Sequence, residues 1–209
     1  MILGIDLGTS MVKAALFGSD GECLAVAARR SSPTSYGQGR MEQDFEEIVT
    51  AVGEVVAEAC TGRPAPHAVG ITGQSDGLWL LDRDGRGCGR AVSWLDDRGN
   101  PYLQDWIDRG VFEAIFRRNG NAIFPGSHAP LMAAISAAEP DRLARAHTAS
   151  YLKDGILQRL TGARVTDTSD ASLPFLDVVA RDYDPEILRM LGLEHCQHLL
   201  APVMAGPGQ

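Results

Sequence analysis

The chain has 209 residues, of which 44% are hydrophobic, with a formal net charge of −8 and a pI near 5.1. This is enough material for one large domain or two small ones, and the negative charge argues against non-specific nucleic-acid binding, which needs a basic surface. The four isolated cysteines and the absence of any apolar run of ~18 residues predict a soluble cytoplasmic protein with reduced thiols, no zinc site and no membrane span.

The first part of the sequence predicts a β-β-β-α-β unit. Apolar runs at residues 2–6, 12–17 and 23–29, separated by turn signals, are typical of an antiparallel meander. Residues 44–59 then place apolar side chains at helical spacing behind Asp44, a suitable N-cap. Residues 67–72 form a short apolar strand, which we expect to join the sheet parallel to the first strand through the helical crossover.

The rest of the chain predicts a hairpin followed by helices. Residues 78–82 and 91–95 flank a polar turn at 83–86, and we expect them to pair. Helical patterns follow at residues 101–109, 111–118, 131–138, 151–160 and 184–193, and Gly162 is suited to cap the fourth of them. The last residues, 202–209, are rich in Gly and Pro and are expected to be coil.

The turn after the first strand has the composition of a phosphate-binding site. Asp6 ends the strand and is followed by Gly8, Thr9 and Ser10. Gly8 allows the backbone to approach a polyanion, the backbone N–H groups and the two hydroxyls can donate to phosphate oxygens, and Asp6 can hold Mg²⁺ through its waters. The alternative is an ordinary hairpin in which Asp6 and Thr9 satisfy turn N–H groups.

A second polar turn follows the parallel strand. Gln74, Ser75 and Asp76 lie at its carboxyl end, where ligands gather in open α/β sheets. The Asp76 carboxylate can accept hydrogen bonds from two sugar hydroxyls, and a polyol site needs such groups because an unpaired buried hydroxyl costs ~1–3 kcal/mol. The alternative is a solvated turn in which Asp76 caps a helix or hairpin.

Five motifs in this order resemble the FGGY carbohydrate kinases, which include xylulokinase, ribulokinase, glycerol kinase and erythritol kinase. They are LGIDLGTS at residues 3–10 with Lys13, MEQD at 41–44, GITGQSDG at 70–77, WLDDR at 94–98, and Lys153-Asp154 followed by TG at 161–162 and DTSDA at 167–171. The resemblance covers essentially the whole chain. It implies an α/β, ribonuclease-H-like fold shared with actin, hexokinase and Hsp70, with a mixed sheet flanked by helices, and ATP- and Mg²⁺-dependent phosphorylation of a sugar or polyol.

The resemblance also assigns site residues. It implies that nucleotide and magnesium are bound by Asp6, Gly8, Thr9, Ser10 and Lys13, with Asp6 as the metal ligand, and that the substrate is bound by Gln74, Ser75, Asp76, Trp94, Asp96 and Arg98. Trp94 would form an aromatic wall beside the sugar, with core packing as the alternative.

The Ser75-Asp76 pair departs from the Met-His of xylulokinases and the Arg-Glu of glycerol kinases. This departure favours a tetritol such as erythritol or another pentulose over xylulose. Lys153-Asp154 is interpreted as a surface or helix-capping pair, and the Asp167–Asp170 loop is expected to shape the domain near the substrate without a catalytic role.

No catalytic residue is assigned, because the resemblance implies a general-base Asp beyond residue 209. We therefore expect a truncated amino-terminal kinase domain that lacks the carboxyl-terminal nucleotide-binding domain, is inactive alone and leaves apolar surface uncovered. The expected ligand is a small sugar or polyol, and a homodimer is one candidate assembly. Two alternatives are an actin- or Hsp70-like ATPase module and a non-catalytic sugar-binding regulator.

Overall fold

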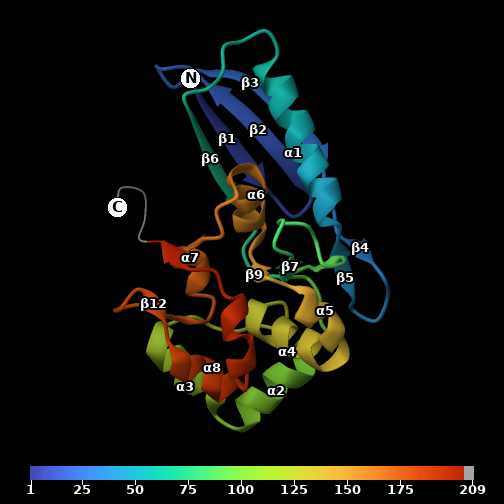
Figure 1. The fold of residues 1–209 in the computed structure, drawn as a ribbon, viewed down its shortest axis with the longest axis vertical. Helices are drawn as coiled ribbons and strands as arrows, with labels where there is room; N and C mark the ends of the chain where they lie inside the picture. The colour runs from blue at the N-terminus through green and yellow to red at the C-terminus, as the bar shows by residue number, and fades with distance from the viewer. Residues whose placement is uncertain (205–209) are drawn as a thin grey trace.

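The structure is a computed structural model that describes residues 1–204. Figure 1 shows the main sheet with one long helix at one end of the molecule and most of the other helices gathered at the opposite end. The sheet contains β1 (Ile2–Leu7), β2 (Met11–Phe17), β3 (Cys23–Arg30) and β6 (Ala68–Gly73), and the long helix is α1 (Phe45–Cys60).

The predicted β-β-β-α-β unit is confirmed. The strand order is β3-β2-β1-β6, with β1, β2 and β3 antiparallel and β6 parallel to β1. Leu3, Ile5 and Leu7 alternate along β1 and are buried in the same hydrophobic cluster as the apolar face of α1. The parallel pairing brings the carboxyl ends of β1 and β6 side by side, which places the two predicted polar turns next to each other.

Helix α1 begins where the sequence predicts. The Asp44 carboxylate accepts hydrogen bonds from the backbone N–H groups of Glu46 and Glu47, which would otherwise lack partners in the first helical turn. Phe45, Ile48, Val52 and Val55 are buried at helical spacing. The helix therefore covers one face of the sheet.

The predicted hairpin of residues 78–82 and 91–95 is wrong as a pair of extended strands. Between the two segments there is one isolated bridge, Leu78 with Val92. Instead, β7 (Trp79–Leu81) pairs with β9 (Thr148–Ser150), and β8 (Ala91–Val92) pairs with β5 (Met41–Gln43), which also pairs with β4 (Thr34–Ser35). These partners are distant in the sequence, so a local pattern cannot predict them.

The five predicted later helices are present, with small shifts at their ends. They are α2 (Asn100–Asp108), α3 (Val111–Asn119), α4 (His128–Ala138), α6 (Leu152–Thr161) and α8 (Pro185–Leu191). Gly162 ends α6 in a left-handed conformation at φ 77°, as its position suggests. Together with neighbouring segments, α2, α3, α4 and α8 enclose a second hydrophobic cluster around Trp106, Leu131 and Phe175, whereas α6 packs into the cluster beneath α1 through Leu152 and Ile156.

Several short elements were not predicted. They are α5 (Pro140–Arg145), α7 (Thr168–Ala171), the 3₁₀ helix η1 (Glu194–Leu199), β10 (Thr166–Asp167), β11 (Leu176–Asp177), β12 (Asp182–Tyr183) and β13 (Val203–Met204). The coil expected at residues 202–209 is therefore wrong at β13, which pairs in parallel with β10. Residues 205–209 of that expectation lie outside the described residues. Within residues 1–204, no helix is both long and apolar enough to cross a membrane.

Candidate functional site

The turn after β1 lies open at the end of the sheet. The backbone N–H of Gly8 donates to the carbonyl oxygen of Met11 at 3.0 Å, and a Cβ atom on Gly8 would come within 3.0 Å of the same oxygen. Thr9 is partly buried and Ser10 is exposed. The turn is therefore tight, and its polar groups are accessible to a ligand.

Asp6 and Lys13 lie opposite each other on β1 and β2, just before and after this turn. The Lys13 ammonium is 3.7 Å from the Asp6 carboxylate, and both side chains are about half exposed. An exposed pair of this kind is weak in water, so either partner can exchange it for a ligand. The carboxylate is a hard oxygen ligand suited to Mg²⁺, and the ammonium is suited to phosphate. The residues present therefore fit a magnesium–nucleotide complex.

The turn after β6 is bonded to the end of β1, directly before the first turn. The backbone N–H of Gln74 donates to the carbonyl oxygen of Leu7 at 2.9 Å. A Cβ atom on Gly73 would lie 2.8 Å from the Cβ of Leu7, so a larger residue at this position would push the turns apart. The two predicted polar turns thus form one continuous surface.

Asp76 is largely buried in this second turn. It is 8% exposed, has a left-handed backbone at φ 60°, and accepts a hydrogen bond from the backbone N–H of His128 at the start of α4. The capping role left open by the sequence is therefore present. Burial raises the pKa of Asp76 to about 7, and the nearby Asp170 charge acts in the same direction, although the His128 N–H opposes the shift. At neutral pH the carboxyl group can thus donate as well as accept a hydrogen bond.

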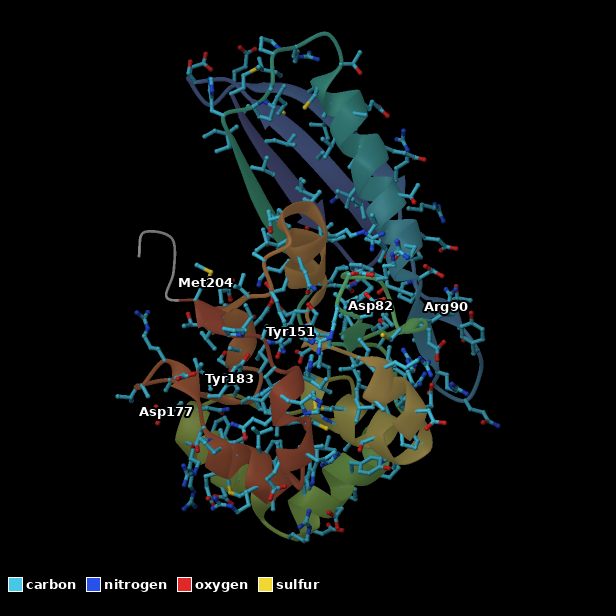
Figure 2. The ribbon with its side chains drawn as sticks, in the orientation of Figure 1. Asp82, Arg90, Tyr151, Asp177, Tyr183 and Met204 are labelled. Carbon is cyan, nitrogen blue, oxygen red and sulfur yellow. The ribbon has the colours of Figure 1, made fainter. Side chains whose placement is uncertain are left out.

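His128 lies fully buried beside the second turn. Burial lowers its pKa to about 3, so the imidazole is neutral and adds no positive charge near Asp76. Its ring packs against Tyr151, with 4.6 Å between the centroids, and Tyr151 is labelled near the centre of the molecule in Figure 2. The surroundings of Asp76 are therefore aromatic and neutral on this side.

Ser75 is tied to a buried ion-pair cluster. Its hydroxyl donates to the Asp170 carboxylate at 3.0 Å, and the Lys153 ammonium contacts Asp154 at 2.6 Å, Asp170 at 2.9 Å and Asp167 at 3.1 Å. The interpretation of Lys153-Asp154 as a surface or helix-capping pair is wrong, because Asp154 is buried and its carboxylate is held by this cluster. Burial raises the pKa of Asp154 to about 6, against the opposing effect of Lys153. The cluster links α6 and α7 to the second turn.

Trp94 forms an aromatic wall beside the first turn. Trp94 is 36% exposed, so core packing does not describe it. Its N–H donates to the Thr9 hydroxyl at 2.9 Å, and its ring meets Phe124 edge-to-face with 6.4 Å between the centroids. Phe124, also 36% exposed, was missed by the sequence analysis, because a single aromatic residue in a loop carries no distinctive signal.

Close backbone packing assembles the loops that carry these groups. A Cβ atom on Gly126 would lie 1.7 Å from the carbonyl oxygen of Trp94, and the Gly77 N–H donates to the Gly126 carbonyl at 3.0 Å. Gly77 itself has φ 74° and a Cβ position blocked by Val92. The Trp94, Asp76 and Phe124 loops therefore fit together only with glycine at these contacts.

Asp96 and Arg98 do not join this surface. The Asp96 side chain is fully buried, and its two oxygens accept from the Arg98 guanidinium at 2.8 and 2.9 Å and from the Met41 N–H at 2.7 Å. Arg98 also contacts Glu42 at 2.7 Å. A ligand could reach Asp96 only if this cluster opened, so in this structure the pair fastens the Trp94 loop to β5.

The described residues contain no group of three or more His, Cys, Asp or Glu side chains placed to hold a metal ion. The site thus offers one carboxylate for a cation, a cluster of hydroxyl and N–H donors beside it, and an aromatic wall with a buried carboxyl group adjoining. This combination can bind a magnesium-chelated polyphosphate next to a small hydroxylated molecule.

Comparison with known proteins gives one consistent result. The model of the amino-terminal domain of the FGGY family of carbohydrate kinases matches residues 1–207. Erythritol kinase from Brucella abortus is 30% identical over a segment that covers 99% of this chain and 40% of the relative. Glycerol kinase from Gloeobacter violaceus is 35% identical over a segment that covers 92% of this chain and 39% of the relative. The chain thus spans about two fifths of these relatives.

Solved structures agree on the fold. A xyloylose kinase from Brucella ovis superposes with a TM-score of 0.87 at 30% identity, covering 98% of this chain and 42% of that one. A gluconate kinase from Lactobacillus acidophilus superposes with a TM-score of 0.89 at 24% identity, covering 97% of this chain and 41% of that one. The predicted α/β fold of the actin-like ATPase class, with its mixed sheet, is confirmed.

Proposed function

This chain belongs to the FGGY family of carbohydrate kinases, and we propose that it forms the part of such a kinase that binds a small sugar or polyol and the phosphates of MgATP. The observation that carries this proposal is the direct contact between the two turns. The backbone N–H of Gln74 donates to Leu7, directly before the first turn, and the indole N–H of Trp94 donates to Thr9 within it. A phosphate donor and a hydroxyl acceptor bound at these turns would be held as neighbours, which phosphoryl transfer requires.

Each residue has a role in the proposed binding. Asp6 would hold Mg²⁺ through its waters, Gly8 would allow the phosphate to approach the backbone, and Lys13, Thr9 and Ser10 would donate to its oxygens. The ion, when bound, would neutralise charge on the transferred phosphoryl group. Asp76 would orient the acceptor hydroxyls, and Trp94 with Phe124 would cover its C–H groups. Asp96 and Arg98 would contribute by fastening the Trp94 loop.

We propose a tetritol or a pentulose as the substrate. The matched relatives include an erythritol kinase and several xylulose kinases. Asp76 can both donate and accept near neutral pH, which suits a row of hydroxyls, and Ser75 is already engaged by Asp170. A short polyol such as erythritol matches this small set of polar groups better than a large sugar.

We also propose that turnover needs the portion that relatives carry beyond the matched segment, including the general base. One supporting observation is an apolar hollow between α1, β6 and α6, lined by Leu3, Ile5, Val49, Val52, Val56, Val69, Ile156 and Leu160. Val69, on the outer strand β6, is 50% exposed. Surface of this kind is normally covered by further structure. The cytoplasmic location of the protein and its assembly as a homodimer remain predictions.

A thermal-shift screen tests the binding proposal. Erythritol, glycerol, xylulose and ribulose would each be added to the wild-type chain, to Asp76→Ala and to Asp84→Ala, an exposed control in the polar turn at 83–86. We expect a tetritol or pentulose to raise the melting temperature of the wild type and of Asp84→Ala but not of Asp76→Ala. If no compound stabilises the wild type, or if Asp76→Ala responds equally, the assignment of this surface to a polyol fails.

A further inference from the structure

Gln43 belongs to the MEQD motif, to which the proposed function gives no role. It is the last residue of β5 and is 2% exposed. Its side-chain nitrogen donates to the carbonyl oxygens of Ser31 at 2.5 Å and Thr9 at 3.4 Å, and its side-chain oxygen accepts from the side-chain nitrogen of Gln74 at 2.9 Å. One buried amide therefore contacts the first turn, the segment after β3 and the second turn.

These partners determine which way the Gln43 amide faces. Backbone carbonyl oxygens only accept hydrogen bonds, so Gln43 must present its NH₂ group to Ser31 and Thr9. The reversed orientation would place oxygen against oxygen at both contacts. The Gln43 oxygen must then face Gln74, and since that oxygen can only accept, Gln74 must present its own NH₂ group to it.

The orientation of Gln74 follows from that of Gln43. Its Oε1 atom is directed away from Gln43, and within the described part of the chain this buried oxygen has no hydrogen-bond donor. Buried acceptors are normally paired with a protein donor or an ordered water, so this oxygen is open to a donor that the described residues do not supply. It belongs to Gln74, which the family resemblance assigns to substrate binding.

The same segments are also joined by backbone hydrogen bonds. The Gln74 N–H donates to Leu7 at 2.9 Å, and the Ser31 N–H donates to Ser10 at 3.0 Å. Gln43 adds a side-chain connection to each of these contacts. Removing the Gln43 amide would therefore loosen both backbone contacts together, although Gln74 and Ser31 are distant from Gln43 in the sequence.

We propose that Gln43 is a positioning residue, which locks the two turns together and holds Gln74 with its Oε1 atom as an acceptor for a donor hydroxyl of the sugar or polyol. The identity of the ligand rests on the proposed function, whereas the locking role rests on the hydrogen bonds alone. The two parts can be tested separately.

Amide hydrogen exchange of the wild-type chain, Gln43→Met and Gln158→Met tests the locking role. Gln158 is a buried glutamine in α6, so its variant is a matched control for the loss of one buried amide. We expect the Gln74 and Ser31 N–H groups to exchange at least ~10-fold faster in Gln43→Met, with amides in the middle of α1 unchanged. Equal rates in Gln43→Met and Gln158→Met would overturn the proposal.

If Gln43→Met does not fold, Gln74→Met removes the other partner of the same hydrogen bond, at a residue that is less buried than Gln43. It should accelerate exchange at Ser31, because Gln43 loses the partner that anchors its oxygen. Unchanged Ser31 exchange in this variant would contradict the locking role.

Calorimetric titration with erythritol and with xylulose tests the acceptor role. We expect Gln43→Met and Gln74→Met each to weaken binding by a similar factor, and the double variant to bind no more weakly than either single one. Additive losses would show that Gln43 does not act through Gln74 and would overturn this part. If the wild type binds neither compound, the proposed function fails, while the exchange experiment still decides the locking role.

Discussion

The indole N–H of Trp94 donates to the hydroxyl oxygen of Thr9 at 2.9 Å, across 85 residues of sequence. Because the Thr9 oxygen accepts this bond, its own proton remains free to be donated elsewhere. A group bound at the first turn is the natural acceptor. The aromatic wall and the first turn are thus one hydrogen-bonded unit.

Trp94→Phe separates the two roles of this side chain, since it keeps an aromatic ring and removes the N–H. We expect MgATP affinity to fall ~2- to 10-fold, as for the loss of one hydrogen bond worth ~0.5–1.5 kcal/mol, and polyol affinity to change less than ~2-fold. Trp94→Leu should weaken both. Calorimetric titration of each ligand measures the difference, and a larger loss for the polyol than for MgATP in Trp94→Phe would count against the coupling.

Asp6→Asn removes an anionic ligand while keeping the volume of the side chain. It also removes the partner of Lys13, which lies 3.7 Å away. We expect Mg²⁺-dependent nucleotide affinity to fall at least ~10-fold, or ~1.4 kcal/mol, with little change when Mg²⁺ is absent. Asp20→Asn in the exposed turn between β2 and β3 is the control. Wild-type MgATP affinity in Asp6→Asn would exclude Asp6 as the metal ligand.

Asp76 should make stability depend on pH in a defined direction. Burial raises its pKa from 3.8 to about 7 in the folded protein, so the folded state binds this proton more tightly than the unfolded state. The resulting stabilisation is present below about pH 4 and is lost as the pH rises to about 7. The Asp76→Asn variant has no titratable group at this position. Asp154, whose pKa is also raised by burial, is present in both proteins, so the comparison isolates Asp76.

Urea denaturation at several pH values measures this effect. The free energy of unfolding of the wild type minus that of Asp76→Asn should decrease by ~1–4 kcal/mol between pH 4 and 7, then level off. A difference that rises with pH would mean that the folded protein favours the carboxylate, and the account of Asp76 would be wrong.

Arg98 should matter for stability far more than an exposed arginine. Its side chain is 13% exposed and holds two buried carboxylates, those of Asp96 and Glu42. Arg98→Met leaves the buried Asp96 carboxylate without a counter-charge and Glu42 with Arg40 alone, at 3.3 Å, and we expect a loss of ~3–5 kcal/mol. Arg117→Met, which breaks an exposed pair with Glu113, should cost less than ~0.5 kcal/mol. Chemical denaturation of both variants tests this, and similar losses would contradict a structural role for the cluster.

The sequence predicts the main sheet well because its information is local. Alternating apolar residues in β1 and β2, joined by a short turn, leave few other pairings, and the crossover through α1 requires β6 to be parallel. The adjacency of Thr9 and Gln74 follows from that topology. By contrast, the pairing of β7 with β9 joins distant segments and overrides the predicted hairpin.

The site is predictable in its residue types but not in its contacts. Asp96 and Trp94 lie two residues apart, yet one is sealed in an ion pair and the other is open to a ligand. No pattern in the sequence distinguishes them, because the burial of Asp96 depends on Arg98 and Glu42 meeting in space. The cluster of Lys153 with Asp170 is hidden for the same reason.

The most direct test of the central claim is a coupled ADP-release assay with erythritol, glycerol, xylulose and ribulose. It would compare the 209-residue chain with the same chain extended at its carboxyl end by the portion of a relative that lies beyond the matched segment. We predict turnover with a tetritol or pentulose by the extended protein, its loss in the Asp6→Asn variant, and little or no turnover by the short chain. Wild-type turnover by the extended Asp6→Asn protein, or no turnover with any of these acceptors, would contradict the account.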